Sequence, residues 1–438
     1  MDTRTAATSI QQTRALALST VAFTTCFAMW TIFSIIGLKI RTNLGLNDTQ
    51  FAVLVATPVL TGSLSRLILG IWTDQYGGRI VFTVLMVASA VASFLLSTVH
   101  TYPMYLLAAL GVGLAGGGFA VGTAYVSRWY STERQGTALG IFGMGNVGSS
   151  ITSSIAPFIL VAYGWEVVAQ AYAGVMLVMA AIFWFGTEDD PVLRARRISG
   201  EKPASTLLQL TPLANLQVWR FSLYYFFVFG AFVALALWLP RYYVGVYGLD
   251  ITVAGMLTAL YTAPASVFRA FGGWLSDKYG ARTVMYWTFI ASVLCTFVLS
   301  YPATDYVVHG IEGPIAFTIA IGVVPFAAIT FVLGFFMSLG KAAVYKHIPV
   351  YYPDHVGSVG GVVGLIGGLG GFALPITFGA MNDLIGVWTA CFMLLFGLVA
   401  TALTWMHFSI RHFERRQIPR GPEHTYLPEL AGTRISGD

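Results

Sequence analysis

Two arginines lie inside long apolar runs, where a charge is costly. Arg66 and Arg269 each stand eight residues before an aspartate, Asp74 or Asp277, that ends the apolar run. Eight helical residues amount to about 12 Å, which places both arginines near the middle of an apolar layer about 30 Å thick. Every Asp and Glu of the chain can be assigned to a loop, a helix end or a tail. Because no carboxylate would balance the arginines, we expect them to face a polar cavity that binds an anion.

The use of arginine at both positions narrows the chemistry of that anion. A guanidinium group is a planar fork that forms two parallel hydrogen bonds with a planar oxyanion, and the ammonium group of lysine does not. Two such forks from different parts of the chain would clamp one small anion between them. In the alternative interpretation, backbone carbonyls and hydroxyls satisfy both arginines, and the pair is structural.

The composition indicates which elements hold these arginines. The chain has 438 residues, of which 56% are hydrophobic and 10% are charged, and this excludes a soluble globular protein. A bilayer core needs about 20 apolar residues per helix. Runs of that length predict an all-α polytopic membrane protein with twelve transmembrane helices, at residues 16–40, 50–72, 80–99, 103–127, 136–160, 167–186, 221–244, 253–273, 282–300, 315–345, 357–380 and 386–410.

The basic residues predict the orientation of these spans. Most Lys and Arg residues lie before the first span, in the even-numbered loops and after the last span, so we expect both termini in the cytoplasm. The basic residues form no patch interleaved with aromatics, which argues against nucleic-acid binding. We expect a monomer that crosses a bacterial inner (plasma) membrane many times and has the lipid bilayer as its partner.

The sequence offers no support for metal, cofactor or enzyme chemistry. Cys26, Cys295 and Cys391 fall inside predicted spans without metal-ligand spacing. The seven histidines lie near loops, helix ends or the tail, and no nucleophile is paired with a base. We therefore expect no metal site and no cofactor in a protein that is not an enzyme.

An internal repeat divides the chain into two halves. The string G-x-x-x-D-x-x-G-x-R runs from Gly70 to Arg79 and recurs from Gly273 to Arg282, and the two buried arginines keep the same offset from it. Such repeats are typical of secondary transporters, which hold their substrate near the midplane between the repeats. We expect two pseudo-symmetric six-helix halves at residues 1–186 and 220–410, a cytoplasmic linker at 187–219 and a cytoplasmic tail at 411–438.

The repeated string also places charges at helix ends. Asp74 and Arg79 in the first half, and Asp277 and Arg282 in the second, flank a short loop. We interpret them as gating residues that pair across the two helices and latch one conformation. The alternative is that they are ordinary loop charges that set the orientation.

Two predicted spans, the fifth and the eleventh, are rich in glycine. Glycine at this density lets helices touch backbone to backbone, so we expect these spans to pack against the eighth and the second, beside the arginines. Most of the glycines would serve packing alone. Asn146 differs, because a buried amide needs hydrogen-bond partners, and a ligand oxygen is a candidate.

The string G-x-x-G-x-G-N-x-G, which begins at Gly140, and the glycine run of the eleventh span resemble the two nitrate signatures of the nitrate/nitrite porter family. This family is a branch of the major facilitator superfamily, whose loop signature the repeated string resembles. The resemblance extends over nearly the whole chain and implies the major facilitator fold. The eleventh span has no asparagine that corresponds to Asn146, so the two signatures are not identical.

The resemblance implies a nitrate site between the halves. Guanidinium forks in the plane of the anion and aromatic faces above and below it suit a trigonal-planar ion. From the residues alone, the aromatics would be assigned to core packing. The substrate-binding residues that the resemblance implies are Arg66, Arg269, Asn146, Phe119, Tyr225, Phe229, Gly143 and Gly145.

Lys341 lies in the tenth span, about 8 Å deeper than Lys346. It could snorkel to the interface. Alternatively, it changes its protonation as the substrate binds and leaves, since no buried carboxylate is available to carry a proton. A lysine at this position, and the short connection between the tenth and eleventh spans, resemble the proton-coupled uptake branch of the family.

The main hypothesis is a secondary active transporter that imports nitrate, with nitrite as a second candidate substrate, by proton symport and alternating access. The closest rival is nitrate/nitrite antiport. A less favoured alternative is a carrier for another small anion, such as an organic phosphate or carboxylate.

Overall fold

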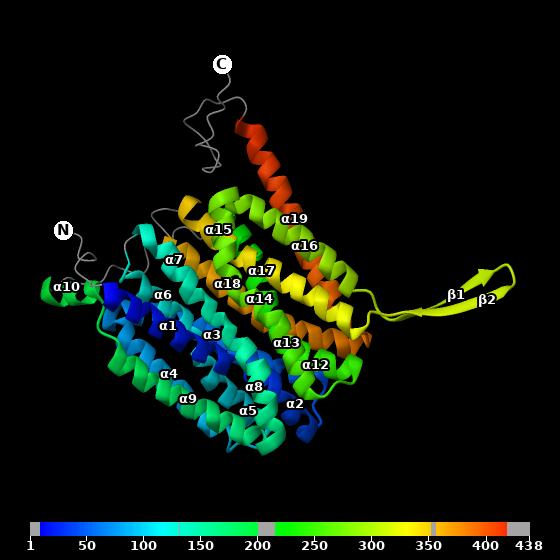
Figure 1. The fold of residues 1–438 in the computed structure, drawn as a ribbon, viewed down its shortest axis with the longest axis horizontal. Coiled ribbons are helices and arrows are strands. Elements are labelled where there is room, and N and C mark those ends of the chain that lie inside the picture. Colours follow the sequence, from blue (N-terminus) through cyan, green and yellow to red (C-terminus); the bar gives the residue numbers. More distant parts are fainter. Residues whose placement is uncertain (1–8, 131, 200–214, 352–355, 418–438) are drawn as a thin grey trace.

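The computed structural model describes residues 9–130, 132–199, 215–351 and 356–417 (Figure 1). Within them, ten helices are long and apolar enough to cross a membrane, and a pair bent by 40° adds an eleventh. α3 (Asp48–Tyr76) is not among these, but its 29 residues make about 43 Å of helix, which is long enough for a twelfth span. The expected all-α membrane architecture is confirmed. Parts of the predicted linker (200–214), of the connection between the tenth and eleventh spans (352–355) and of the predicted tail (418–438) lie outside the described residues.

Several spans of the first half are broken where small residues cluster. In the fourth span, a 3₁₀ turn with two glycines separates two α-helices. In the fifth span, a 3₁₀ turn with one glycine does the same. The elements of this half are α1 (Ser9–Trp30), α2 (Phe33–Leu44), α3, α4 (Gly78–Leu96), α5 (Tyr102–Gly113), η2 (Leu114–Gly117), α6 (Gly118–Ser127), α7 (Thr132–Gly143), η3 (Met144–Val147), α8 (Gly148–Tyr163) and α9 (Trp165–Gly186).

The second half contains two further irregular spans. The seventh includes a π-helical stretch, and the eighth is the bent pair. A short helix, α10 (Pro191–Ser199), forms within the predicted linker. The elements of this half are α11 (Leu216–Tyr225), η5 (Phe226–Ala231), α12 (Phe232–Tyr247), α13 (Ile251–Thr262), α14 (Pro264–Val267), α15 (Arg269–Tyr279), α16 (Ala281–Leu299), α17 (Val323–Tyr351), α18 (Val356–Ile385) and α19 (Ala390–Gln417).

The halves meet along two helix pairs. α3 packs along α18, and α8 packs along α13. A Cβ atom added at Gly255 would lie 2.2 Å from the carbonyl oxygen of Ser153, and one at Gly379 would lie 2.4 Å from that of Asp48. Both glycines therefore allow direct contact between backbones of opposite halves. The expected packing of the fifth span on the eighth, and of the eleventh on the second, is confirmed.

A β-hairpin separates α16 from α17. Its strands, β1 (Thr304–Gly310) and β2 (Gly313–Ile319), pair antiparallel and project from the bundle (Figure 1). The predicted start of the tenth span at residue 315 is therefore wrong, and α17 begins at Val323. The turn explains the error, because Gly310 and Gly313 enclose a two-residue loop and Gly313 has a φ of 136°, which favours glycine.

The two ends of the helix bundle are called the linker end and the hairpin end. The linker end is the one at which α1 begins and α10 lies, and the hairpin end is the opposite one, from which β1 and β2 project (Figure 1).

Candidate functional site

Arg66 and Arg269 come from opposite halves and meet at one aromatic ring. Arg66 lies within α3, and Arg269 is the first residue of α15. Their guanidinium carbons lie 5.6 and 5.8 Å from the centroid of the Phe119 ring. Their exposed fractions are only 8% and 7%. The structure thus places two cations on either side of a boundary between the halves, out of contact with bulk water.

Arg66 is only partly satisfied by the backbone. Its Nη1 donates a hydrogen bond of 3.0 Å to the carbonyl oxygen of Gly364 in α18, and its Nε makes a long contact of 3.4 Å with that of Gly116. Aromatic rings flank the rest of the group, since Trp30 and Phe229 have centroids 5.6 and 5.5 Å from its guanidinium carbon. The structural alternative therefore applies to Arg66 in part.

The guanidinium group of Arg269 has fewer hydrogen bonds than that of Arg66. Its Nη1 is buried and has no hydrogen-bond partner among the described residues. Arg269 follows an interruption of the helix at Phe268, between α14 and α15. A Cβ atom added at Gly143 would lie 3.2 Å from the guanidinium carbon, so a glycine at this position gives the arginine room. Gly145 serves packing instead, because a Cβ there would lie 2.4 Å from the Phe23 ring in α1.

Asn146 is a buried amide without a protein partner. It lies in η3, 1% exposed, and neither Oδ1 nor Nδ2 makes a hydrogen bond within the described part of the chain. η3 packs against α14, the segment that precedes Arg269. Buried amides are nearly always hydrogen-bonded in native proteins. Both polar atoms of Asn146 are therefore available to a ligand that enters between the halves.

The seventh span supplies a stacked aromatic pair. Tyr225 and Phe229 lie face to face, with centroids 5.1 Å apart and planes inclined by 7°. Phe229 falls in the π-helical stretch η5, a feature that often occurs at functional sites. One edge of this pair contacts Tyr345 of α17, whose ring centroid lies 5.0 Å from that of Tyr225.

Tyr345 is a site residue that the sequence did not single out. Its ring centroid lies 5.7 Å from the guanidinium carbon of Arg269, and its hydroxyl donates to the carbonyl oxygen of Gly360 at 3.1 Å. The available signal was its spacing, because it lies four residues after Lys341 and therefore on the same face of α17.

Lys341 is enclosed between helices and does not snorkel. It is fully buried, and its Nζ has no hydrogen-bond partner among the described residues. That Nζ lies 3.5 Å from the centroid of the Phe232 ring. The snorkelling alternative is therefore wrong. The ion pairs seen in the described part of the chain lie toward helix ends, at Asp48, Glu188, Asp190 and Asp277.

A polar cluster joins the halves at the hairpin end. Asp48 Oδ1 accepts hydrogen bonds from Arg41 at 2.9 Å and from Arg241, in the second half, at 3.1 Å. Asn382 donates to the other carboxylate oxygen at 3.3 Å, and Asp383 accepts from the backbone amides of residues 48 and 49. This cluster could not be seen in the sequence, because its members lie on α2, α3, α12 and α18, far apart along the chain.

The residues that the sequence predicts to act as a gate lie toward the linker end. Arg79 donates to the carbonyl oxygen of Trp184 at 2.7 Å, and Asp277 pairs with Lys346 of α17. Arg282 lies at the start of α16, partly buried, and the side chain of Asp74 is outside the described part. Pairing of these residues across the flanking helices stays a prediction.

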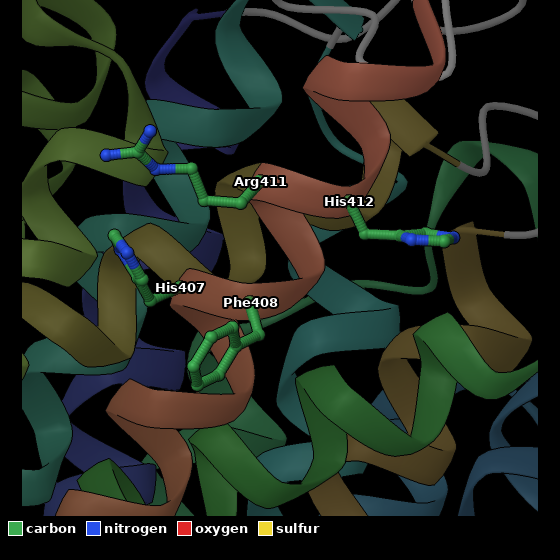
Figure 2. A pocket seen from close by; sticks show the side chains of 4 residues that line it. All are labelled: His407, Phe408, Arg411 and His412. Carbon is green, nitrogen blue, oxygen red and sulfur yellow. The ribbon is translucent and has the colours of Figure 1, made fainter.

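A surface cavity lies elsewhere, on the last turns of α19. It has a volume of about 480 Å³ and is lined by His407, Phe408, Arg411 and His412. Figure 2 shows His407 and Arg411 pointing to one side of the helix and His412 to the other. All four residues belong to one helix at the linker end, so this cavity is separate from the site between the halves.

Comparison with known proteins places the chain in a family. Residues 18–330 and 254–434 match the model of the Major Facilitator Superfamily. The chain is 43% identical over 412 residues to the "Probable nitrate/nitrite antiporter NarK1" of Thermus thermophilus, with 91% of each chain covered. It is 31% identical to the "Probable nitrate transporter NarT" of Staphylococcus haemolyticus, covering 88% of this chain and 94% of that one. It is 28% identical to the "Nitrite extrusion protein" of Bacillus subtilis, covering 91% and 96%.

A solved structure has the same fold. It is a bacterial homolog of the human lysosomal transporter Spinster in an inward-facing conformation, with a TM-score of 0.70, 14% identity, and 93% of this chain and 99% of that chain covered. The chain is thus a multi-pass membrane transporter that belongs to the major facilitator superfamily and, within it, to the nitrate/nitrite porter family.

Proposed function

We propose that this protein imports nitrate across a bacterial inner membrane by proton symport, with nitrite as a second substrate. The observation that carries the proposal is the meeting of Arg66 and Arg269, from opposite halves, at the ring of Phe119. Among the described residues, neither arginine forms an ion pair with a carboxylate. The names of the relatives, which include nitrate and nitrite transporters, support the choice of anion.

Binding would use the planar shape of the anion. Arg66 lies about equally far from the rings of Phe119 and Phe229, at 5.6 and 5.5 Å. A flat anion that takes its in-plane hydrogen bonds from guanidinium groups would have these rings on its faces. The unpartnered Nη1 of Arg269 and the amide of Asn146 would replace hydrogen bonds to water that the anion loses when it enters the site.

Proton coupling would follow from charge balance. The site holds Arg66 and Arg269 as permanent cations, and entry of nitrate adds one negative charge. A proton taken up by Lys341 would return the net charge to its value before binding. Binding of proton and of anion would then favour each other by the same factor, as linkage requires, and both would cross together.

Alternating access would require the cluster at Asp48 to separate. Hydrogen bonds from Arg241 and Asn382 to Asp48 join the halves at the hairpin end, so opening of that end breaks them. With both termini in the cytoplasm, as the basic residues predict, the hairpin end is periplasmic. The described contacts then correspond to a molecule closed toward the periplasm.

The rival function is exchange of nitrate for nitrite, which the printed name of the NarK1 relative favours. The two functions differ in driving force. Symport predicts that proteoliposomes accumulate nitrate when a pH gradient, acid outside, is imposed. Exchange predicts accumulation only with nitrite inside, whatever the pH gradient. Uptake that needs internal nitrite and ignores pH would reject symport and support exchange.

A carrier for a larger anion is the remaining alternative. Competition by organic phosphates and carboxylates against labelled nitrate tests it. Nitrate and nitrite alone should compete, because three aromatic rings have their centroids 5.5 to 5.6 Å from the guanidinium carbon of Arg66 and would crowd a larger anion. Stronger competition by an organic anion would overturn the assignment of nitrate.

A further inference from the structure

The nearest group to the Lys341 ammonium is an aromatic face. Nζ lies 3.5 Å from the ring centroid of Phe232, and both side chains are fully buried. A cation over the face of an aromatic ring is attracted by the quadrupole of the ring, and this attraction is largest where water is excluded. The neutral amine gains little from the same contact.

The other charged and titratable groups around Lys341 provide no counter-ion. Within the described part of the chain they are Arg269 of α15, Tyr261 of α13, whose ring centroid lies 6.0 Å from that of Phe232, and, on the same helix, Tyr345, which contacts Tyr225 of α11. None of them is a carboxylate, and Nζ has no hydrogen-bond partner in the described part. A proton on Lys341 would therefore depend on the ring of Phe232 and on the charge of the anion.

Phe232 also contacts both halves of the transporter. Its ring lies nearly parallel to that of Phe27 in α1, with centroids 6.5 Å apart, and it lies 6.4 Å from Phe229. Phe229 in turn flanks Arg66. One aromatic chain thus connects the ammonium of Lys341 to the anion site and to the opposite half.

We propose that Phe232 is the positioning residue for proton coupling: its ring holds the protonated form of Lys341 beside the anion site, in place of a carboxylate. This inference rests on the proposed function, since it assigns a role in proton-coupled uptake. It makes Phe232 important for the pH dependence of transport and much less important for binding of the anion itself.

The test compares ring removal at Phe232 with ring removal nearby. Phe232→Leu and Phe232→Met both fill most of the volume of the ring without an aromatic face. The test can be made with either variant, so it still works if one of them does not fold. Phe232→Tyr keeps the face. Phe227→Leu is the matched control, because Phe227 is equally buried in η5 and packs on Phe289 instead of Lys341. Purified variants are placed in proteoliposomes, and nitrate uptake is measured against external pH.

We expect the half-maximal pH of uptake to move about one unit toward acid in Phe232→Leu or Phe232→Met. That shift corresponds to a loss of about 1.4 kcal/mol of stabilisation of the proton. Nitrate counterflow measured at one acid pH on both sides of the membrane, where Lys341 is protonated in the wild type and in the variants alike, should stay within about twofold of wild type. Phe232→Tyr and Phe227→Leu should keep the wild-type pH profile.

A result that refutes the role of Phe232 can be distinguished from one that refutes proton symport. If wild-type uptake responds to pH and both ring-free variants respond identically, the role of Phe232 is refuted while symport stands. An equal shift in Phe227→Leu would refute it as well, because the effect would be one of packing. If wild-type uptake ignores pH, both symport and the role of Phe232 are rejected.

Discussion

Arg66 of the first half donates a hydrogen bond from Nη1 to the carbonyl oxygen of Gly364 in the second half, at 3.0 Å. The arginine that would bind the anion is therefore also a contact between the halves. A shift of Arg66 toward a ligand would break or lengthen this contact between α3 and α18. If Arg66 binds the anion as proposed, arrival and departure of the anion would act directly on the interface between the halves.

Gly143 gives Arg269 the room that it needs, and a methyl group at this position should disturb the clamp. In Gly143→Ala, the added Cβ would lie 3.2 Å from the guanidinium carbon, which moves the group by a few tenths of an ångström. We expect the Kd for nitrate to rise about tenfold, because small misplacements of a binding group are costly. Gly140→Ala is the control, since nothing lies within 4 Å of its added Cβ. Equal affinity in the two variants would contradict this role of Gly143.

The unpaired amide of Asn146 should lower the thermal stability of the protein when no substrate is bound. An unpaired buried polar group costs about 1–3 kcal/mol, so Asn146→Leu should raise the Tm of the empty protein. The same variant should bind nitrate about 10- to 100-fold more weakly, and addition of nitrate should no longer raise its Tm. Thermal unfolding with and without nitrate measures both effects.

Ser149→Ala provides the control for Asn146, because the Ser149 hydroxyl is buried nearby and already donates to the carbonyl oxygen of residue 146 at 3.0 Å. It should keep the wild-type affinity for nitrate. A normal nitrate-dependent rise of Tm in Asn146→Leu would show that the amide does not contact the anion.

Neutralising Asp48 should open the hairpin end. In Asp48→Asn, Arg41 and Arg241 lose their shared carboxylate, and two neighbouring cations are left without a counter-ion, which weakens the contact between the halves. We expect the population open at the hairpin end to increase, measured as a longer distance between spin labels on α2 and α12. Asp305→Asn in the exposed hairpin should leave the distances unchanged. Unaltered distances in Asp48→Asn would mean that the cluster does not hold this end closed.

The sequence predicted the fold and the buried arginines well, because both depend on strong physical costs. Uninterrupted apolar length predicts a membrane helix, and a charge such as Arg66 inside one demands a polar neighbour. The hairpin at 304–319 was missed because its second strand, from residue 315 onward, is as apolar as the start of a helix, and the turn is signalled mainly by Gly310 and Gly313.

The contacts between remote segments could not be predicted from the sequence. Tyr345 and Phe232 look like ordinary core aromatics in a chain that is 14% aromatic. Their proximity to Arg269 and Lys341 depends on how α12, α15 and α17 pack in three dimensions. Asp48 likewise is, in the sequence, only an acidic residue at the start of a helix, and it is the packing of α12 and α18 that brings Arg241 and Asn382 to it.

Glu188 should make the stability of the linker end depend on pH. Hydrogen bonds from Arg194 and Arg14 to its carboxylate, at 2.7 and 2.6 Å, lower its pKa in the folded protein, with that from Arg194 as the main cause. A lowered pKa stabilises the fold above the unfolded value of about 4.3, and this stabilisation is lost as pH falls through the folded value. Glu188→Gln should therefore have a lower Tm than wild type at pH 7 and an equal one at acid pH. A difference in Tm that does not change with pH would contradict this.

The central claim is that Arg66 and Arg269 clamp the anion with planar guanidinium forks. It is tested most directly by measuring the nitrate Kd of Arg66→Lys and Arg269→Lys in detergent, with Arg411→Lys on α19 as the control. Each site variant keeps the charge and loses the fork, so we expect a Kd at least about 100-fold higher, a loss of about 2.7 kcal/mol, with the wild-type value in the control. Wild-type affinity in either site variant would contradict the clamp.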